Sequence, residues 1–224
     1  MKCSRAIAAA PVVLAACSGP LSTLDPGGDV ARDIARLWWG MLAGAVLITV
    51  FVLVLLALGF GRPRAALQRH WIYGLGLWFS MAVLAVVLGA GLWVGERIVP
   101  RDDGAVTVRA HAVQWGWHFT HDGADGRPVT DTRTLHIPAG QPVDILVTSQ
   151  DVIHSFWVPQ LAGKMDAIPG RVNRLRVQAD RAGRFDGLCA EFCGLGHAAM
   201  RFDVRAHDVW PPAVADRTIQ EGHP

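Results

Sequence analysis

Side chains that bind soft metals are concentrated in one short stretch of this 224-residue chain. The stretch reads Cys189-Ala190-Glu191-Phe192-Cys193-Gly194-Leu195-Gly196-His197-Ala198-Ala199-Met200. One thiolate, two imidazoles and a weak thioether form the ligand set of a single-copper electron-transfer site. Cys193, His197 and Met200 supply part of that set, and a separate segment supplies the second imidazole in His154.

The loop contains a second thiol, Cys189, which lies four residues before Cys193. This thiol changes the number of ions that the loop could hold. Two thiolates can bridge two copper ions, and each ion then takes one terminal imidazole, from His154 or His197. The weak positions would be filled by the Met200 sulfur on one ion and by the backbone carbonyl of Glu191 on the other. An electron shared between two bridged ions spreads the geometric change on reduction over many bonds, which favours fast electron transfer.

Two other uses of the same residues remain open at this stage. Paired cysteines in exported domains usually form a disulfide, but a disulfide between Cys189 and Cys193 leaves His197 and Met200 without a role. A zinc site would use cysteine and histidine but gains nothing from methionine. Binuclear copper is therefore the interpretation that we prefer.

The part of the chain that must position these ligands has the pattern of an all-β domain. After Glu96, continuous apolar runs give way to short alternating segments separated by Pro, Gly and Asp. Examples are Val106–Phe119, Val143–Thr148, Val172–Val177 and Met200–Arg205. This pattern predicts an antiparallel sandwich or barrel. Residues 104–208 suffice for one such core, and the tail 209–224 is too polar and Pro-marked to form a further domain.

Two apolar runs precede the predicted sandwich, at residues 37–61 and 71–95. Each is free of charged side chains and exceeds the roughly 20 residues that cross a bilayer core. The linker 62–70 carries three arginines and no acid, whereas segment 17–36 contains several aspartates. By the positive-inside rule, we expect a cytoplasmic linker. The N-terminus and the copper domain would then both lie on the outer side of the membrane.

Residues 1–16 have the features of a secretory signal. Lys2 and Arg5 precede an apolar stretch that is too short to span a membrane. The stretch ends Leu14-Ala15-Ala16-Cys17, which resembles a bacterial lipobox, so Cys17 is a candidate for lipidation. A plain signal peptide is the alternative. The net charge of +2, without a basic run that contains interleaved aromatics, offers no case for a nucleic-acid partner.

Four motifs together resemble subunit II of cytochrome c oxidase. They are the C-x-E-x-C-x3-H-x2-M loop, Gln114-Trp115-Gly116-Trp117, Asp151–Pro159 and Lys164–Arg171. The resemblance extends from Trp38 to about Asp208. It implies a cupredoxin-like sandwich on a two-helix transmembrane hairpin in the bacterial inner membrane, packed against a haem-bearing catalytic subunit I. It also implies that electrons from cytochrome c pass through copper A to the haems, where oxygen is reduced to water with proton pumping.

The resemblance assigns a role to each matching residue. The copper A set would be His154, Cys189, Glu191, Cys193, His197 and Met200. The Glu191 side chain would bind a magnesium ion shared with subunit I. Trp115 would be the tryptophan through which electrons enter, with a core aromatic on a strand as the alternative, and Trp117 would pack on the same strand face. Asp151 and Asp166 match acids at the donor-docking face and at the subunit interface.

The chain also departs from the family. Many members have a Glu before the second helix, on a proton-uptake path, where this chain has Arg69-His70-Trp71. No C-x-x-C-H motif follows the sandwich, so we expect no haem in this chain and a separate soluble or membrane-anchored cytochrome c as donor. Three other functions remain: a quinol oxidase subunit, whose family lacks the copper ligands; an assembly subunit with a vestigial site; and the copper A subunit of nitrous-oxide or nitric-oxide reductases.

Overall fold

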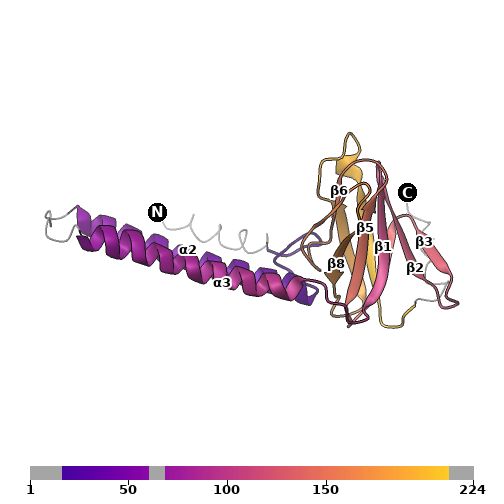
Figure 1. Ribbon diagram of the computed structural model, residues 1–224, viewed down its shortest axis with the longest axis horizontal. Coiled ribbons are helices and arrows are strands. Elements are labelled where there is room, and N and C mark those ends of the chain that lie inside the picture. The colour runs from indigo at the N-terminus through magenta and orange to yellow at the C-terminus, as the bar shows by residue number, and fades with distance from the viewer. Residues whose placement is uncertain (1–16, 61–68, 212–224) are drawn as a thin grey trace, which may run out of the picture. The chain divides into compact units, whose positions relative to one another are not determined.

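The computed structural model describes residues 17–60 and 69–211 (Figure 1). The chain divides into two compact units. One contains residues 33–98, and the other contains everything before and after them. The predicted signal, most of the linker between the apolar runs and most of the C-terminal tail lie outside the described residues.

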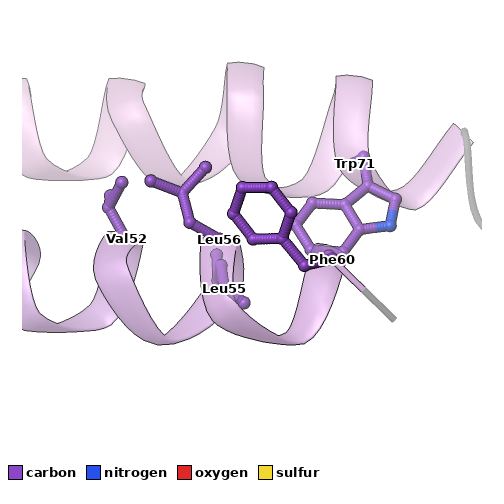
Figure 2. A pocket seen from close by; sticks show the side chains of 6 residues that line it. Val52, Leu55, Leu56, Phe60 and Trp71 are labelled. Carbon is purple, nitrogen blue, oxygen red and sulfur yellow. The ribbon is translucent and has the colours of Figure 1, made fainter. Parts of the chain in front are cut away.

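Two long apolar helices form the first unit. Helix α2 spans Asp29–Gly59, and the second helix spans His70–Ile98, beginning with the π-helical turns η2 (His70–Phe79) and continuing as α3 (Ser80–Ile98). Both are long and apolar enough to cross a membrane. Helix α2 begins before its charge-free run and ends two residues short of it, whereas the second helix extends past its run at both ends. Their side chains also line an apolar pocket, formed by Val52, Leu55, Leu56, Gly59, Phe60 and Trp71 (Figure 2).

Within the described residues, ten strands make up most of the second unit. They are β1 (Val106–Val113), β2 (Gly116–Asp122), β3 (Pro128–Asp131), β4 (Thr134–Pro138), β5 (Val143–Ser149), β6 (His154–Trp157), β7 (Met165–Ala167), β8 (Asn173–Val177), β9 (Gly183–Cys189) and β10 (Arg201–His207). They make two five-stranded sheets, in the orders β3-β2-β1-β5-β8 and β4-β10-β9-β6-β7. The predicted fold class, two apolar helices with an all-β sandwich, is confirmed.

The pairing of strands differs from the prediction in two places. Strands β1 and β5 are parallel, and so are β4 and β10. Parallel neighbours need a crossover connection, and in both cases other strands of the sandwich supply it. The segment 106–119, predicted as one alternating run, is two antiparallel strands, because the chain reverses at Gln114 and Trp115.

Aromatic rings fill the space between the sheets. Trp117, Phe119, Phe156 and Phe202 are nearly inaccessible to solvent. Their ring centroids lie 4.9 to 6.5 Å apart. Each large side chain buried in this way contributes roughly 1.5–3 kcal/mol relative to exposure. Gly187 on β9 makes room for the cluster, since a Cβ there would lie 2.2 Å from the Phe202 ring.

The chain ahead of α2 packs on the sandwich. The Gly27 amide donates to the Gln160 carbonyl (2.8 Å), and the Gly27 carbonyl accepts from the Asp180 amide (2.9 Å). A Cβ at Gly28 would lie 2.0 Å from the Gln178 carbonyl oxygen, so only glycine permits this close approach. The segment up to the first turn of α2 therefore belongs to the sandwich unit.

Ion pairs hold the chain that follows α3 against β5 and β8. The guanidinium of Arg176 binds Asp144 at 2.8 Å and Asp103 at 2.7 Å. Arg174 binds Asp102 at 2.6 Å. The hydrogen bonds of Arg176 lower the pKa of Asp103. Together these contacts anchor residues 100–103 to the edge of one sheet.

Candidate metal centre

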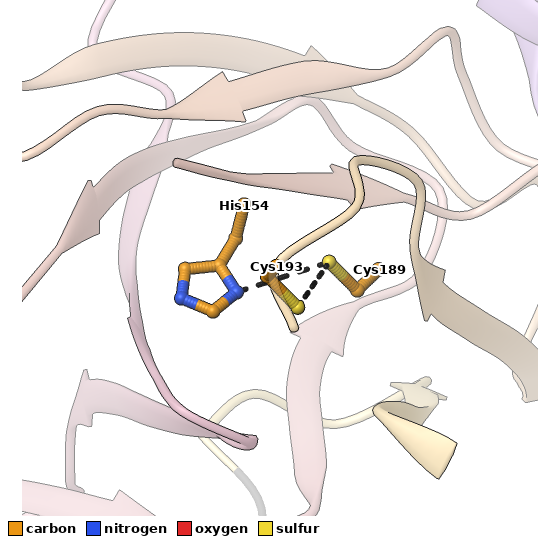
Figure 3. Close-up of side chains that lie close together, drawn as sticks. All are labelled: His154, Cys189 and Cys193. Atoms are coloured by element: carbon orange, nitrogen blue, oxygen red, sulfur yellow. Dashed lines mark hydrogen bonds between the residues drawn. The ribbon is translucent and has the colours of Figure 1, made fainter. Parts of the chain in front are cut away.

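The predicted copper ligands lie together at one end of the sandwich. His154 is the first residue of β6, and Cys189 is the last residue of β9. These strands pair with Phe156 opposite Cys189, which brings the two ligands to the same end. The connection from β9 to β10 carries Cys193, His197 and Met200 back over that end. Figure 3 shows His154 and the two cysteines, whose ligand atoms all lie within 4.8 Å of one another.

The distances between donor atoms suit shared metal ions. The sulfurs of Cys189 and Cys193 are 3.8 Å apart, and Cys189 Sγ lies 3.9 Å from Nδ1 of His154. Cys193 Sγ lies 3.7 Å from Nδ1 of His197 and 3.8 Å from Sδ of Met200. Ligands bound at about 2.0–2.3 Å to one ion lie roughly 3.3–4 Å from each other. All four side-chain contacts fall in that range.

Glu191 presents its backbone, not its side chain, to the cysteines. The Cys189 thiol donates to the Glu191 carbonyl oxygen at 3.3 Å. The Glu191 residue is exposed. The carbonyl of Glu191 thus lies on the side of the cysteines, and the metal roles predicted for its carbonyl and its carboxylate stay predictions.

Both cysteines are buried free thiols in the structure. Burial, together with the neighbouring Cys189, raises the pKa of Cys193 to about 11. Metal binding must therefore displace protons from the sulfurs. The unjoined sulfurs lie beside two imidazoles and a thioether, and this set favours a metal site over a structural disulfide.

Asp151 holds the buried ring of His154, a predicted copper ligand, in orientation. Oδ1 of Asp151 lies 2.9 Å from Nε2 of His154, so Nδ1 is left facing the cysteines. The Asp151 carboxylate also accepts hydrogen bonds from the amides of Gln114 and Val152, each at 2.7 Å. Burial acts to raise the pKa of Asp151, but these hydrogen bonds outweigh it and lower the pKa to about 2. A carboxylate on the far nitrogen of a ligand histidine is a recurrent feature of metal sites.

Trp115 packs against the loop 189–200, which carries most of the predicted copper ligands. It occupies the turn between β1 and β2, is 45% exposed, and its indole N–H donates to the Cys193 carbonyl at 3.2 Å. A Cβ at Gly196 would lie 2.4 Å from the indole, so the glycine of the loop makes room for it. The alternative of a core aromatic on a strand is therefore wrong for Trp115. Trp117, in contrast, lies on β2 and is buried as packing.

Two further predicted sites are not in the cluster of copper ligands. Asp166 is exposed on the edge strand β7, opposite Ser155 of β6. Cys17 lies in the segment ahead of α2, and its carbonyl accepts a hydrogen bond from Ser22 Oγ at 2.9 Å. Their roles at a subunit interface and in lipidation stay predictions. The hydrogen bond between Asp151 and His154 was not predicted from the sequence, although the two residues are only three positions apart.

Comparison with known proteins gives the family. Residues 121–207 match the family model described as "Cytochrome C oxidase subunit II, periplasmic domain". Cytochrome c oxidase subunit 2 of Arabidopsis thaliana is 30% identical over 217 residues, which cover 81% of this chain and 82% of that protein. The chain belongs to the cytochrome c oxidase subunit 2 family.

Other members of the family show similar identity. Cytochrome c oxidase subunit 2 of Alkalihalophilus pseudofirmus is 30% identical over 223 residues, covering 88% of this chain and 64% of the relative. The chain thus spans less than two thirds of the length of that bacterial protein. The solved periplasmic domain of the subunit II CoxB from Bradyrhizobium japonicum is 30% identical, with a TM-score of 0.44 over 50% of this chain and 88% of that one.

Membership of the cytochrome c oxidase subunit 2 family implies a copper A centre, and the residues present fit one. Both thiols, both imidazoles, the thioether and the Glu191 carbonyl converge at one end of the sandwich. The family and the two apolar helices indicate a membrane protein with a periplasmic domain.

Proposed function

We propose that this chain is the electron-accepting subunit of a cytochrome c oxidase and that it holds two copper ions between Cys189 and Cys193. The observation that carries the proposal is the pair of buried thiols, 3.8 Å apart, with an imidazole beside each. When bound, the copper ions would take up and release one electron at a time. The protein would bind, orient and shield them.

The chain's own residues would set the geometry and the route of the electron. Asp151 fixes the ring of His154, so that this ligand needs little movement when the charge of the centre changes. Trp115 connects the protein surface to the proposed copper site. Its half-exposed indole donates a hydrogen bond to the backbone carbonyl of Cys193. We propose that electrons from cytochrome c enter through this indole. Asp151, whose side chain is partly exposed, would also contribute charge to the docking face.

The electrons would then pass to the haems of a catalytic subunit I, where the whole complex would reduce oxygen to water and pump protons. The exposed carboxylate of Glu191 is the group that we propose as a ligand for magnesium shared with that subunit. The exposed Asp166 would lie at the same subunit interface. No haem is proposed within this chain.

The proposed location is the bacterial inner membrane, with both the N-terminus and the copper domain on the periplasmic side. The arginine-rich linker supports a cytoplasmic position for residues 62–70. Cleavage of the predicted signal after residue 16 and acylation of Cys17 would attach the mature N-terminus to lipid. The complete ligand set disfavours a quinol oxidase subunit or a vestigial site.

The test is a copper count and an electron paramagnetic resonance spectrum of the purified full-length protein in detergent. We expect two copper ions per chain and a hyperfine pattern from one unpaired electron shared by two copper nuclei. Cys189→Ser should abolish that pattern, because the remaining side chains are a single-copper set. Cys17→Ser is the matched control and should leave the pattern intact. A wild-type spectrum with the electron confined to one copper nucleus contradicts the proposal.

A further inference from the structure

Gln114, in the turn between β1 and β2, contacts two separate parts of the proposed copper site. It directly follows β1 and directly precedes Trp115. Its backbone amide donates to Oδ2 of Asp151 at 2.7 Å, and its side-chain nitrogen Nε2 lies 2.7 Å from the carbonyl oxygen of Cys193. Asp151 in turn holds the ring of His154. One residue therefore connects the supports of two predicted ligands that come from separate segments of the chain.

The direction of the contact between Gln114 and Cys193 follows from its chemistry. A backbone carbonyl only accepts hydrogen bonds, so the amide nitrogen of the Gln114 side chain, and not its oxygen, must face the Cys193 carbonyl. The indole N–H of Trp115 donates to the same carbonyl at 3.2 Å. The Gln114 contact is the shorter of the two, and it is also shorter than the usual N–H···O separation of about 2.9–3.0 Å.

The backbone of the loop 189–200 is shaped to admit both donors. Gly194 follows Cys193 and has a φ of +118°, a conformation that glycine adopts readily and other residues do not. A Cβ at Gly194 would lie 3.2 Å from Nε2 of Gln114 and 3.2 Å from Cζ2 of Trp115. The Gly194 carbonyl itself accepts the amide of His197 at 3.1 Å, within the loop. The turn at residues 114–115 therefore holds the loop from outside at the peptide where these internal bonds begin.

Cys193 lies at the centre of the predicted ligand set. Its sulfur is 3.7–3.8 Å from the donor atoms of Cys189, His197 and Met200. A movement of the peptide that carries this thiol would change all three distances together. Outer hydrogen-bond partners that orient a ligand in this way affect both metal affinity and the electronic properties of a bound metal. The donor on the Cys193 carbonyl is therefore placed to influence the whole site.

We propose that Gln114 is a positioning residue for Cys193 and that it raises the reduction potential of the copper centre. The second part rests on the proposed function, because the potential is a property of bound copper. The side-chain N–H of Gln114 directs the positive end of its dipole at the peptide of a ligand. Reduction adds one negative charge to the centre, and a positive dipole end nearby favours the reduced form. Loss of this donor should therefore favour the oxidised form.

Redox titration of the copper-loaded, full-length protein in detergent tests the effect on the potential. Gln114→Met keeps the length of the side chain but has no N–H, and Gln114 is exposed, so the core packing stays intact. We expect the equilibrium to shift toward the oxidised form by roughly two- to tenfold, the effect of one lost hydrogen bond, which is about 18–59 mV for a one-electron couple. A wild-type potential in Gln114→Met, with two copper ions bound, overturns the proposal.

Gln160→Met is the matched control. The side-chain nitrogen of Gln160 also donates to a backbone carbonyl, that of Asp25 at 3.2 Å, but this carbonyl lies in the segment ahead of α2. The control should have the wild-type potential, and a shift as large as that of Gln114→Met overturns the proposal.

Amide hydrogen exchange of the copper-free protein tests the positioning role without bound metal. We expect the amide of His197, which is bonded within the loop, to exchange roughly two- to tenfold faster in Gln114→Met, because the loop has lost one of its outer hydrogen bonds. Gln160→Met should exchange at the wild-type rate. Equal exchange in Gln114→Met and the wild type overturns the positioning role. Faster exchange in Gln114→Met, in a protein that does not bind two copper ions, supports the positioning role and contradicts the proposed function.

Discussion

Asp151 Oδ1 accepts the Nε2–H of His154 at 2.9 Å, and this single contact determines which nitrogen of the histidine faces the cysteines. The carboxylate is itself held by two backbone amides, one of them from the turn that carries Trp115. The proposed metal ligand His154, the acid that supports it and the proposed route of electron input are therefore parts of one hydrogen-bonded structure.

We expect Asp151→Ala to lower copper affinity by about 10–100-fold, because His154 loses the partner that fixes its orientation. Competition with a copper chelator measures the change. Asp125→Ala is a suitable control, since Asp125 is an exposed acid on the loop before β3. Unchanged affinity in Asp151→Ala would show that packing alone orients the ring. The same variant, mixed with cytochrome c at several ionic strengths, tests whether Asp151 also steers docking.

Trp115→Ala should slow electron input from reduced cytochrome c by a large factor, with little change in the copper spectrum or in binding of the donor. The indole N–H donates to the Cys193 carbonyl, which also accepts from the side-chain amide of Gln114, and the indole is the aromatic group of the two. Trp115→Phe keeps an aromatic ring but loses the N–H, so its rate should be intermediate. Stopped-flow mixing with the assembled oxidase provides the measurement. If Trp115→Ala accepted electrons at the wild-type rate, Trp115 would not be the site of electron entry.

Gly196→Ala tests the fit between the copper loop and the indole. Its Cβ would lie 2.4 Å from a ring atom of Trp115, so the ring or the loop must move. We expect a loss of roughly 1–3 kcal/mol in unfolding free energy, as for other overpacked sites, together with slower electron input. Gly183→Ala on β9 is the control, because a Cβ there meets nothing within 4 Å. Equal denaturant midpoints for the two variants would contradict the expected clash.

The segment ahead of α2 should stabilise the sandwich unit. A soluble chain in which a short Gly/Ser linker replaces residues 33–98 keeps this segment, whereas a chain that begins at residue 99 lacks it. The linker is feasible because the side chains of Asp33 and Arg97 lie 3.5 Å apart. We expect the longer chain to unfold at higher denaturant concentration, since Gly27 and Gly28 pack closely on the sandwich. Identical midpoints would mean that this packing contributes nothing.

The part of the site that could be predicted from sequence is the part that is local in sequence. Four of the proposed ligands occupy one loop of twelve residues, and their types and spacing are those that copper chemistry favours. The parallel pairing of β1 with β5 was missed because alternation records which face is buried but not which strand is adjacent. The bond from Trp115 to Cys193 spans 78 residues and depends on how two loops meet at the end of the sandwich.

The N-terminal segment is synthesised first but packs on residues that are synthesised much later. Residues 17–32 and 99–211 belong to one unit, so residues 33–98, which contain both apolar helices, are an insertion within the sandwich unit. The nascent segment cannot complete its contacts early, because Gln160 and Asp180 are synthesised long after Gly27. Asp180 leaves the ribosome only nine residues before Cys189. The N-terminal segment can therefore pack on the sandwich only at a late stage of synthesis. The loop 189–200, with most of the proposed copper ligands, is made at the same stage.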